Sequence, residues 1–168
     1  MPAPDYAAFT RALAAPGAQP DLAIDALCAL TKAHVGVKLF TLMTYDDRRG
    51  YAQRIYSNMP EAYPVSGTKP ANRTRWSEDV IEARRIFVAN DIDAIATVFD
   101  DHALIRSIGC ESVINVPVEI GGEVVGTVNC LHEAGFYTPE RVAAAEALKL
   151  PAAACFLLNR YIATEGAR

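Results

Sequence analysis

Residues 109–142 constrain the fold of this chain more than any other segment. They read GCESVINVPVEIGGEVVGTVNCLHEAGFYTPERV, in which two β-rich runs, residues 112–120 and 123–131, are joined by Gly121-Gly122. Two glycines suit a tight hairpin turn because they adopt positive φ without a steric penalty. Thr138-Pro139-Glu140 then supplies a cap, a proline at the first helical position and an acid near the helix start. We therefore expect an antiparallel hairpin followed by a long helix.

The residues before this segment contain two helical patterns and a second β-rich pair. Apolar side chains recur at helical spacing in residues 5–15 and 20–36, and the second pattern ends at Gly36, a residue type that is common just after a helix. Residues 37–45 and 51–57 are rich in β-branched and aromatic side chains and flank a short turn. These patterns predict two helices followed by a hairpin.

Between the two hairpins the pattern is irregular at first. Residues 59–76 contain three prolines, one glycine and no apolar period, which predicts a long loop of the kind that often covers a binding site. Ser77 is expected to cap a short helix, and residues 85–91 are expected to form a strand. Residues 97–109 are expected to form a helix with Leu104 facing the core.

The predicted order of elements defines the fold class. Hairpins in both halves favour a mainly antiparallel sheet with helices packed on its faces, which is an α+β architecture. The 168 residues suit one domain. We expect residues 1–19 to form an N-terminal helix and linker, residues 20–162 to form a single domain, and residues 163–168 to form a tail.

Charge and composition exclude several classes of partner. The net charge of −4 and the pI near 5.4 provide no basic field, so nucleic acid is not an expected partner. No uninterrupted apolar run approaches the length of a membrane span, and the first residues carry no basic leader. We therefore expect a cytoplasmic protein without membrane contact.

Cysteine and histidine spacing argues against metal and disulfide sites. The four cysteines and three histidines are scattered, with no CxxC pair and no pair at zinc-finger spacing. We therefore expect no metal and no cofactor. Redox catalysis needs an exposed thiol of low pKa. Cys110, at a predicted helix end, is the one plausible nucleophile, and a buried inert thiol is the favoured interpretation.

Four fragments in order resemble the GAF domain family, relatives of the PAS fold. They are a helix that ends in SIGCES, the strand INVPV, the strand GGEVVGTVN after its glycine turn, and FYTPE at the entry to the last helix. The resemblance covers roughly residues 20 to 160 and identifies the chain as a stand-alone GAF domain protein. It implies a GAF/PAS-like central antiparallel β-sheet flanked by helices, with the terminal helices on one face and a small-molecule pocket on the other.

Three better-defined activities of that family predict residues that can be checked here. Cyclic-nucleotide-binding members have Asn-Lys, then Phe, three residues and Asp-Glu; this chain keeps Asn129 and Phe136 but lacks the lysine and the Asp-Glu pair. Phytochrome-type members attach a bilin to a cysteine just before a histidine. In this chain the residue before His102 is Asp101, so the attachment cysteine is missing at that position. Free methionine-(R)-sulfoxide reductases have clustered cysteines in their pocket loops, whereas residues 59–76 contain none.

Two asparagines stand inside the apolar runs of the first segment. Period-two alternation places Asn115 on the side of its strand opposite Ile114 and Val116, and places Asn129 on the same side as Thr127. If these sides face the pocket, both amides can hydrogen-bond a ligand. Alternatively, they bond only to backbone or to each other across the strands, which also satisfies a buried amide. The residues leave both interpretations open.

Further candidate ligand contacts follow from residue type and position. Trp76, beside a predicted helix start, could stack on a planar ligand or anchor a lid in the core. The polar side chains near it, Tyr63 and Arg75, could bind a carboxylate of a ligand or be solvated. Carboxylates near the next helix start could bind a ligand or offset its dipole. These candidates are Tyr63, Arg75, Asp91, Asp100 and His102.

The leading functional interpretation is a small-molecule-binding sensor or accessory regulatory protein. The sequence has no helix-turn-helix, kinase or cyclase segment, so we expect it to report through association. The alternatives are a small enzyme on the same pocket, either a thiol-dependent reductase or a hydrolase using Asp and His, and a dimerisation module with a degenerate pocket. We also expect a homodimer, because the terminal helices carry surplus apolar side chains. These are Tyr6, Phe9, Leu13, Leu148, Phe156, Leu157, Tyr161 and Ile162.

Overall fold

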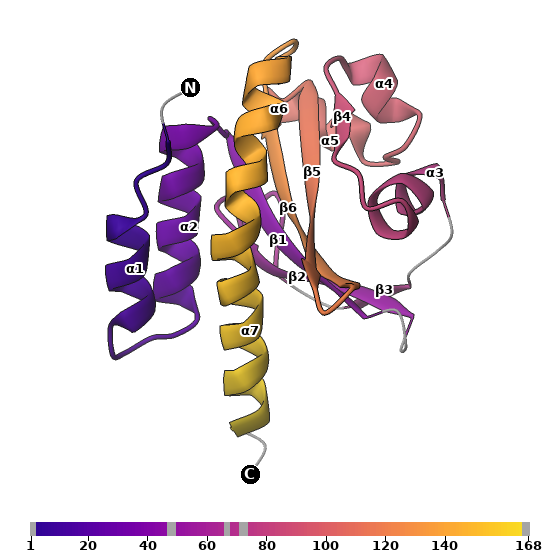
Figure 1. Ribbon diagram of the computed structural model, residues 1–168. Helices are drawn as coiled ribbons and strands as arrows, with labels where there is room; N and C mark the ends of the chain where they lie inside the picture. Colours follow the sequence, from indigo (N-terminus) through magenta and orange to yellow (C-terminus); the bar gives the residue numbers. More distant parts are fainter. Residues whose placement is uncertain (1–2, 47–49, 66–67, 71–73, 166–168) are drawn as a thin grey trace.

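The computed structural model of this chain describes residues 3–46, 50–65, 68–70 and 74–165. One sheet separates a layer of long helices from a group of short ones (Figure 1). The strands are β1 (Leu39–Asp46), β2 (Tyr51–Ser57), β3 (Thr68–Pro70), β4 (Phe87–Ala89), β5 (Ser112–Ile120) and β6 (Glu123–His132). The helices are α1 (Ala7–Ala14), α2 (Asp21–His34), α3 (Arg75–Ser77), α4 (Ile92–Ala96), α5 (His102–Ser107), α6 (Pro139–Ala145) and α7 (Lys149–Glu165), with a π-helical turn η1 (Glu78–Glu82) and a 3₁₀ turn η2 (Glu146–Leu148).

The sheet has six strands in the order β3-β2-β1-β6-β5-β4, and every described pairing is antiparallel. The two predicted hairpins are present as β1/β2 and β5/β6, and the second turns at Gly121 and Gly122, both of which have positive φ. Pairing of β1 with β6 joins the hairpins at the centre of the sheet. The architecture is therefore α+β, as the element order predicts.

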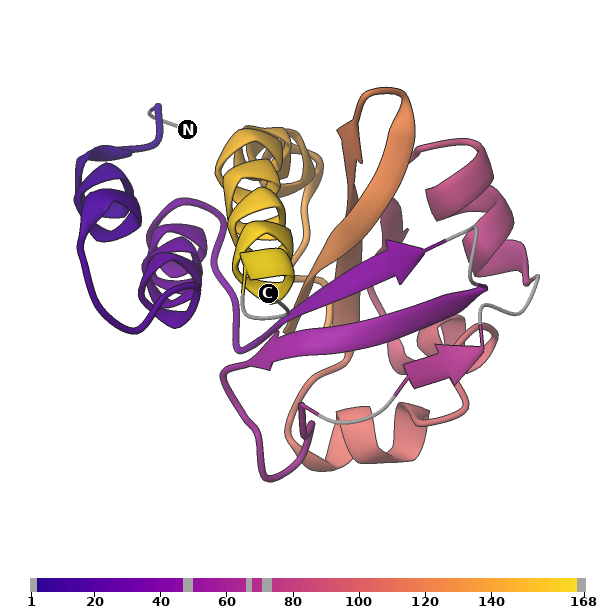
Figure 2. The ribbon, with the colours of Figure 1, turned by 90° about the horizontal axis from the view of Figure 1, so that it is seen from below.

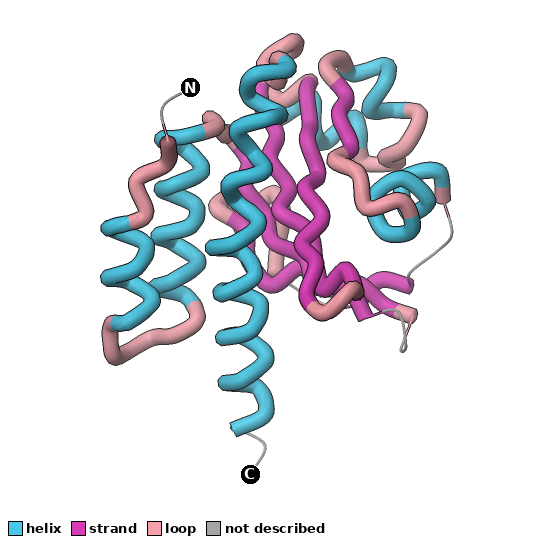
Figure 3. Tube along the Cα trace, in the orientation of Figure 1, coloured by secondary structure: helices cyan, strands magenta, loops and turns pink. Residues whose placement is uncertain are grey.

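Helices α1, α2, α6 and α7 lie on one side of the sheet (Figures 2 and 3). The main core forms where α2 and α7 meet this face, and its members include Ile24, Leu27, Phe40 and Phe156. Gly126 of β6 provides room here, because a Cβ at that position would lie 2.5 Å from the Phe156 ring. A bare backbone in the central strand thus lets α7 approach the sheet closely.

The segments between the hairpins differ from the sequence-based expectation. The predicted long loop 59–76 contains the short strand β3, which pairs with β2, and the start of α3. Thr74, not Ser77, caps that helix: its Oγ1 accepts from the Ser77 backbone N–H, and the Ser77 side chain bonds the Thr74 backbone N–H in return. A capping box thus begins at Thr74, immediately before α3, and sequence reasoning missed it.

The predicted helix over residues 97–109 is also only partly correct. Of these residues, His102–Ser107 form the short helix α5, whereas α4 lies before them, because it begins after the Asp91 cap and ends at Ala96. Leu104, expected in the core, is exposed, and Ile105 is buried in its place. The sequence did not show at which residue α5 begins, so the side of the helix that faces the core could not be predicted.

The last helix begins at the expected Pro139 and changes geometry before Pro151. The 3₁₀ turn η2 separates α6 from α7 and ends three residues before Pro151. By length and composition, the continuous helical stretch 139–165 could cross a membrane. Eighteen of its residues have a mean hydropathy of 1.4, and 33% of those residues are buried in the protein. Core helices of water-soluble proteins meet the same criterion.

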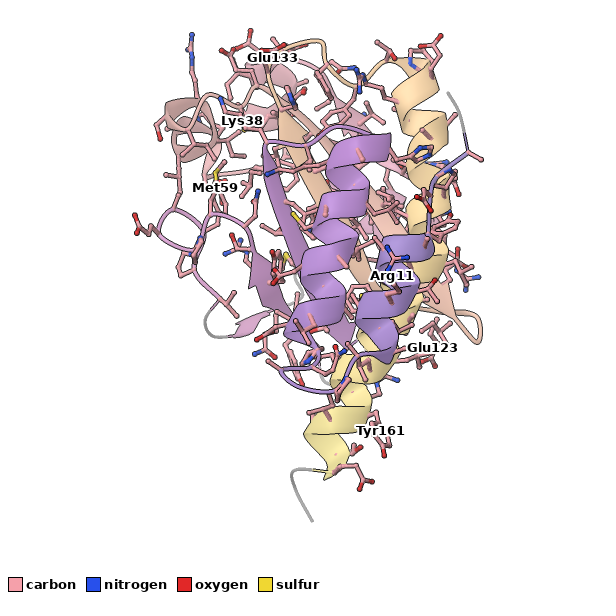
Figure 4. All side chains as sticks on the ribbon, turned by 90° about the vertical axis from the view of Figure 1, so that its left-hand side faces the viewer. Arg11, Lys38, Met59, Glu123, Glu133 and Tyr161 are labelled. Atoms are coloured by element: carbon pink, nitrogen blue, oxygen red, sulfur yellow. The ribbon has the colours of Figure 1, made fainter. Side chains whose placement is uncertain are left out.

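The terminal helices bury more of their apolar side chains than expected. Phe9, Leu148 and Phe156 belong to the core of their own domain and are not surplus surface. Three other large apolar side chains of α7 are exposed: Leu150 (75%), Leu157 (50%) and Tyr161 (62%). Tyr161 lies on the part of α7 that extends past the ends of α1 and α2 (Figure 4).

Candidate functional site

The face of the sheet opposite the long helices carries a cavity of about 230 Å³. Strands β1, β2, β5 and β6 form its floor, and the lining residues outside the sheet are Tyr63, Trp76, Phe99, Asp101 and Ile105. The lining residues are Leu39, Thr41, Met43, Arg54, Tyr63, Trp76, Phe99, Asp101, Ile105, Val113, Asn115, Asn129 and Leu131. A water occupies about 30 Å³ in the liquid, so this space equals that of about eight waters.

A continuous chain of hydrogen bonds crosses the cavity floor. Trp76 Nε1 donates to Asn115 Oδ1 at 2.9 Å, and Asn115 Nδ2 donates to Asn129 Oδ1 at 2.7 Å. Asn129 Nδ2 then donates to Thr41 Oγ1 at 3.2 Å. The two asparagines and Thr41 are buried, which makes their mutual pairing favourable, since an unpaired buried amide costs about 1–3 kcal/mol.

The strand register explains why these side chains meet. Asn129 is the direct partner of Asn115 on one neighbouring strand and of Thr41 on the other. Directly opposite residues of an antiparallel pair point to the same face, so the three side chains form one row across β5, β6 and β1. The amides therefore face the cavity and bond each other across the strands, and their contact with a ligand stays a prediction.

This row does not use all the hydrogen-bonding capacity of its members. An amide NH₂ has two donors, and the chain of bonds uses one from Asn115 and one from Asn129. Thr41 accepts through its hydroxyl oxygen and retains its own proton as a donor. The cavity floor can therefore donate hydrogen bonds to a bound molecule without losing its internal pairing.

A second polar group lies at the β2 side of the cavity. The Tyr63 hydroxyl donates to Asp101 Oδ2 at 2.9 Å, and the Arg54 guanidinium lies over the Tyr63 ring, 4.9 Å from its centre. Arg54 Nη1 donates to the carbonyl of Pro64 at 3.1 Å. Arg54 Nε is buried and has no hydrogen-bond partner among the described residues.

Burial dominates the protonation of this group. It lowers the pKa of Arg54, while the neighbouring Tyr63 and Asp101 act in the opposite direction. Burial also raises the pKa of the Tyr63 phenol, and the Asp101 carboxylate adds to that effect. The salt bridges of the described residues do not include an Arg54–Asp101 pair. Tyr63 lies between the two groups in the chain of contacts, because its ring contacts Arg54 and its hydroxyl donates to Asp101.

Apolar side chains complete the cavity. Leu39, Val113 and Leu131 come from the sheet, and Ile105 comes from α5; all four belong to one buried cluster that is separate from the core of the helical face. Phe99 packs against the same cluster. The cavity thus combines an apolar body with polar groups at two places, the composition typical of small-molecule sites.

Four of the residues predicted from the sequence line the cavity: Tyr63, Trp76, Asn115 and Asn129. Arg75, Asp91, Asp100 and His102 do not. Arg75 and Asp100 are exposed, Asp91 caps α4 by accepting from Ala94 N–H at 2.7 Å, and His102 Nδ1 lies 3.1 Å from the Phe99 carbonyl oxygen. Their predicted roles as ligand contacts remain predictions that this geometry does not favour.

Sequence reasoning missed Arg54 and Thr41 and did not select Asp101. Thr41 had a usable signal, since it lies two residues from both Leu39 and Met43 in a predicted strand and therefore shares their side of it. Arg54 had none, because a register shift between Leu42 and Met43 of β1 places Tyr56 and Arg54, two residues apart, on opposite faces of β2. Alternation alone would have grouped Arg54 with Tyr56, which packs on the helical face.

A larger hollow of about 680 Å³ lies between β4 and α6. Its two arginines already have partners: Arg84 contacts Glu119 and the Gly122 carbonyl, and Arg85 contacts Asp79. No buried side-chain donor or acceptor of its lining lacks a partner among the described residues. The smaller cavity is therefore the stronger candidate for a binding site.

The described residues offer little for metal or thiol chemistry. No group of three His, Cys, Asp or Glu side chains is placed to hold a metal ion in the described part of the chain. All four cysteines are buried, and burial raises their pKa values, that of Cys155 to about 12. Cys110 is fully buried and does not line the cavity.

Comparison with solved structures identifies the fold. The GAF domain of a two-component sensor histidine kinase from Bacillus halodurans is similar with a TM-score of 0.65 and 12% identity, over 86% of this chain and 99% of that one. The GAF domain of a phosphoenolpyruvate-protein phosphotransferase from Coxiella burnetii has a TM-score of 0.66 and 15% identity, over 95% and 93%. The chromophore-binding domain of a bacteriophytochrome from R. palustris has a TM-score of 0.60 and 12% identity, over 96% and 60%.

At these identities the structures show a shared fold and nothing finer. A search of curated proteins finds no match. The family model described as GAF domain, however, matches residues 21–154, which include the whole sheet, α2 and the cavity. Since this match covers most of the chain, the protein belongs to the GAF domain family.

Proposed function

We propose that this GAF domain binds a small molecule in the 230 Å³ cavity and acts as a metabolite sensor or accessory regulatory protein. GAF domains commonly bind small molecules in signalling proteins. The observation that carries the proposal is the hydrogen-bonded row from Trp76 to Thr41, because it lines a mainly apolar cavity and its members have donors that the row does not use. A purely structural core would more simply place apolar side chains there.

Trp76 provides the experiment, since it is the only tryptophan and it lines the cavity. Purified protein labelled with ¹⁵N is titrated with a fragment library, and the indole N–H resonance of Trp76 is followed. Binding in the cavity is expected to shift this resonance in a saturable way, and Asn115→Leu is expected to weaken the same fragments. Mass spectrometry of small molecules that co-purify gives a second readout. If no fragment shifts the resonance and nothing co-purifies, the sensor function is rejected.

The burial of the thiols weighs against the enzyme alternative. A thiolate nucleophile needs exposure and a lowered pKa, and the described cysteines have neither. Turnover of a sulfoxide substrate that is lost in Cys110→Ser would overturn this preference. An Asp-His hydrolase is also disfavoured. Nδ1 of His102 lies at hydrogen-bond distance from the Phe99 carbonyl oxygen, and His102 does not line the cavity.

We also propose that the protein forms a homodimer through α7. The exposed side chains Leu150, Leu157 and Tyr161 recur at a spacing that places them along one helix side. Two copies of such a side can pair about a two-fold axis and bury the same residues in each subunit. The signal from an occupied cavity would then pass through the sheet to α7, which contacts β5 and β6.

A further inference from the structure

We propose that the cavity selects small monocarboxylates, and that Arg54 Nε–H binds the carboxylate while the Asn115–Asn129 row binds a second acceptor at the other end of the ligand. This inference rests on the proposed small-molecule function and specifies its ligand class. It uses three observations: a buried donor without a partner, unused donors on the sheet, and the net charge of the cavity.

The donor is Arg54 Nε. Its N–H is buried in a cavity wall and has no acceptor among the described residues, while Nη1 is held by the Pro64 carbonyl. Contact of the guanidinium with the Tyr63 ring adds a second constraint on its orientation. A buried cationic donor in this state is best satisfied by an anionic oxygen, since charge-assisted hydrogen bonds are roughly twice as strong as neutral ones.

The register of the sheet sets the length of the ligand. Arg54 pairs with Met43, and Thr41 lies two residues away on the same strand as Met43, opposite Asn129. Two residues along a strand span roughly 7 Å, and neighbouring strands lie about 4.8 Å apart. A molecule that contacts both Arg54 and the amide row therefore needs acceptors at two ends of a short body, which also fits a space equal to about eight waters.

The charge of the cavity sets the charge of the ligand. Arg54 and Asp101 are the charged residues of the lining, and they offset each other. Tyr63 donates to Asp101 Oδ2, and Asp101 itself lines the cavity. One negative charge can be accepted by Arg54, whereas a second would be repelled by Asp101. This distinguishes monocarboxylates from dicarboxylates and from phosphate dianions.

The apolar walls set the body of the ligand. Trp76, Phe99, Leu39, Val113 and Leu131 line the same cavity as the two polar groups. A flat or branched hydrocarbon body would bury its surface against them. An aromatic monocarboxylate with a hydroxyl group at its far end has all three required features, so 4-hydroxybenzoate is a suitable probe.

The test uses matched triplets of fragments in which only the charged end changes. Each carboxylate, with 4-hydroxybenzoate among them, is compared with its carboxamide and its methylamine, and dissociation constants are taken from the shift of the Trp76 indole resonance. We expect the carboxylates to bind about tenfold or more tightly than their amides, the range for a hydrogen bond to a charged group. Terephthalate is expected to bind more weakly than its monoamide.

Variants assign the preference to its residues. In Arg54→Met the carboxylate and the amide should bind equally, whereas Arg106→Met removes the same charge from the exposed face of α5 and should change nothing. Asp101→Asn keeps an acceptor for Tyr63 and should remove the penalty on terephthalate. Circular dichroism spectra confirm that each variant is folded before its constants are compared.

The outcomes separate the ligand class from the binding function. If amides or amines shift Trp76 as tightly as carboxylates, or if Arg54→Met retains the preference, the monocarboxylate inference is wrong while small-molecule binding stands. If no member of any triplet shifts the resonance, and the broader library also fails, both are wrong. A carboxylate preference that is lost with Arg54 and kept with Arg106→Met supports the inference.

Discussion

The indole Nε1 of Trp76 donates a 2.9 Å hydrogen bond to Oδ1 of Asn115, which joins the segment over the cavity to the floor of the sheet. Trp76→Phe keeps an aromatic ring but removes the donor. We expect the free energy of unfolding to fall by about 1 kcal/mol, the usual net value of such a bond. Urea denaturation followed by circular dichroism measures it.

A double-mutant cycle isolates this bond from the packing of the ring. Trp76→Phe is repeated in an Asn115→Ala background, where the acceptor is absent and the loss due to the missing bond should disappear. Equal losses in both backgrounds would mean that the two side chains do not interact in solution.

The Tyr6 hydroxyl donates to the Ala147 carbonyl at 2.8 Å. Pro151 has no N–H for the carbonyl four residues before it, so Tyr6 supplies the donor that the proline lacks. Tyr6→Phe should therefore lower the free energy of unfolding by about 1 kcal/mol. Tyr161→Phe is the matched control, because Tyr161 is exposed, and it should have no effect. Comparable stability of both variants would contradict a role for this bond.

The α7 homodimer is tested by Leu157→Glu combined with Tyr161→Glu. Both side chains are at least half exposed, so the domain should stay folded. The new carboxylates of the two subunits should repel each other across a two-fold interface. Light scattering at micromolar concentration should change from the dimer mass to the monomer mass. Leu104→Glu, on α5, should leave the dimer intact.

Two results would argue against this interface. A wild-type protein of monomer mass removes the proposal, and association with vesicles in place of self-association would assign the apolar side of α7 to a membrane surface. Phe156→Glu is not a useful probe, because Phe156 is 4% exposed and its replacement would unfold the core.

Cys155 should make stability depend on alkaline pH. Burial raises the pKa of its thiol from 9.0 to about 12, so the unfolded thiol ionises at lower pH than the folded one. The stabilising contribution is complete below pH 9 and is lost progressively between about pH 9 and 12. The free energy of unfolding of Cys155→Ala should therefore fall less steeply over that range than that of the wild type. Parallel curves would show that the folded thiol titrates normally.

Much of the fold followed from local sequence pattern. Gly121-Gly122 between two β-rich runs predicted the β5/β6 hairpin, and Thr138-Pro139 predicted the start of α6, because turn and cap chemistry depends on a few adjacent residues. Alternation likewise placed Asn115 on the side of its strand opposite Ile114 and Val116, and the structure shows that this side faces the cavity.

The rest was decided by tertiary structure. The register shift opposite Leu42 and Met43 turns Arg54 toward the cavity, and no local signal marks it, since a bulge is set by pairing with another strand. The bond from Trp76 to Asn115 joins residues that are 39 positions apart, and the bond from Tyr63 to Asp101 spans 38. Sequence pattern records which residues share a strand or a helix; only packing of the elements decides which polar groups meet and which, like Arg54 Nε, remain available to a ligand.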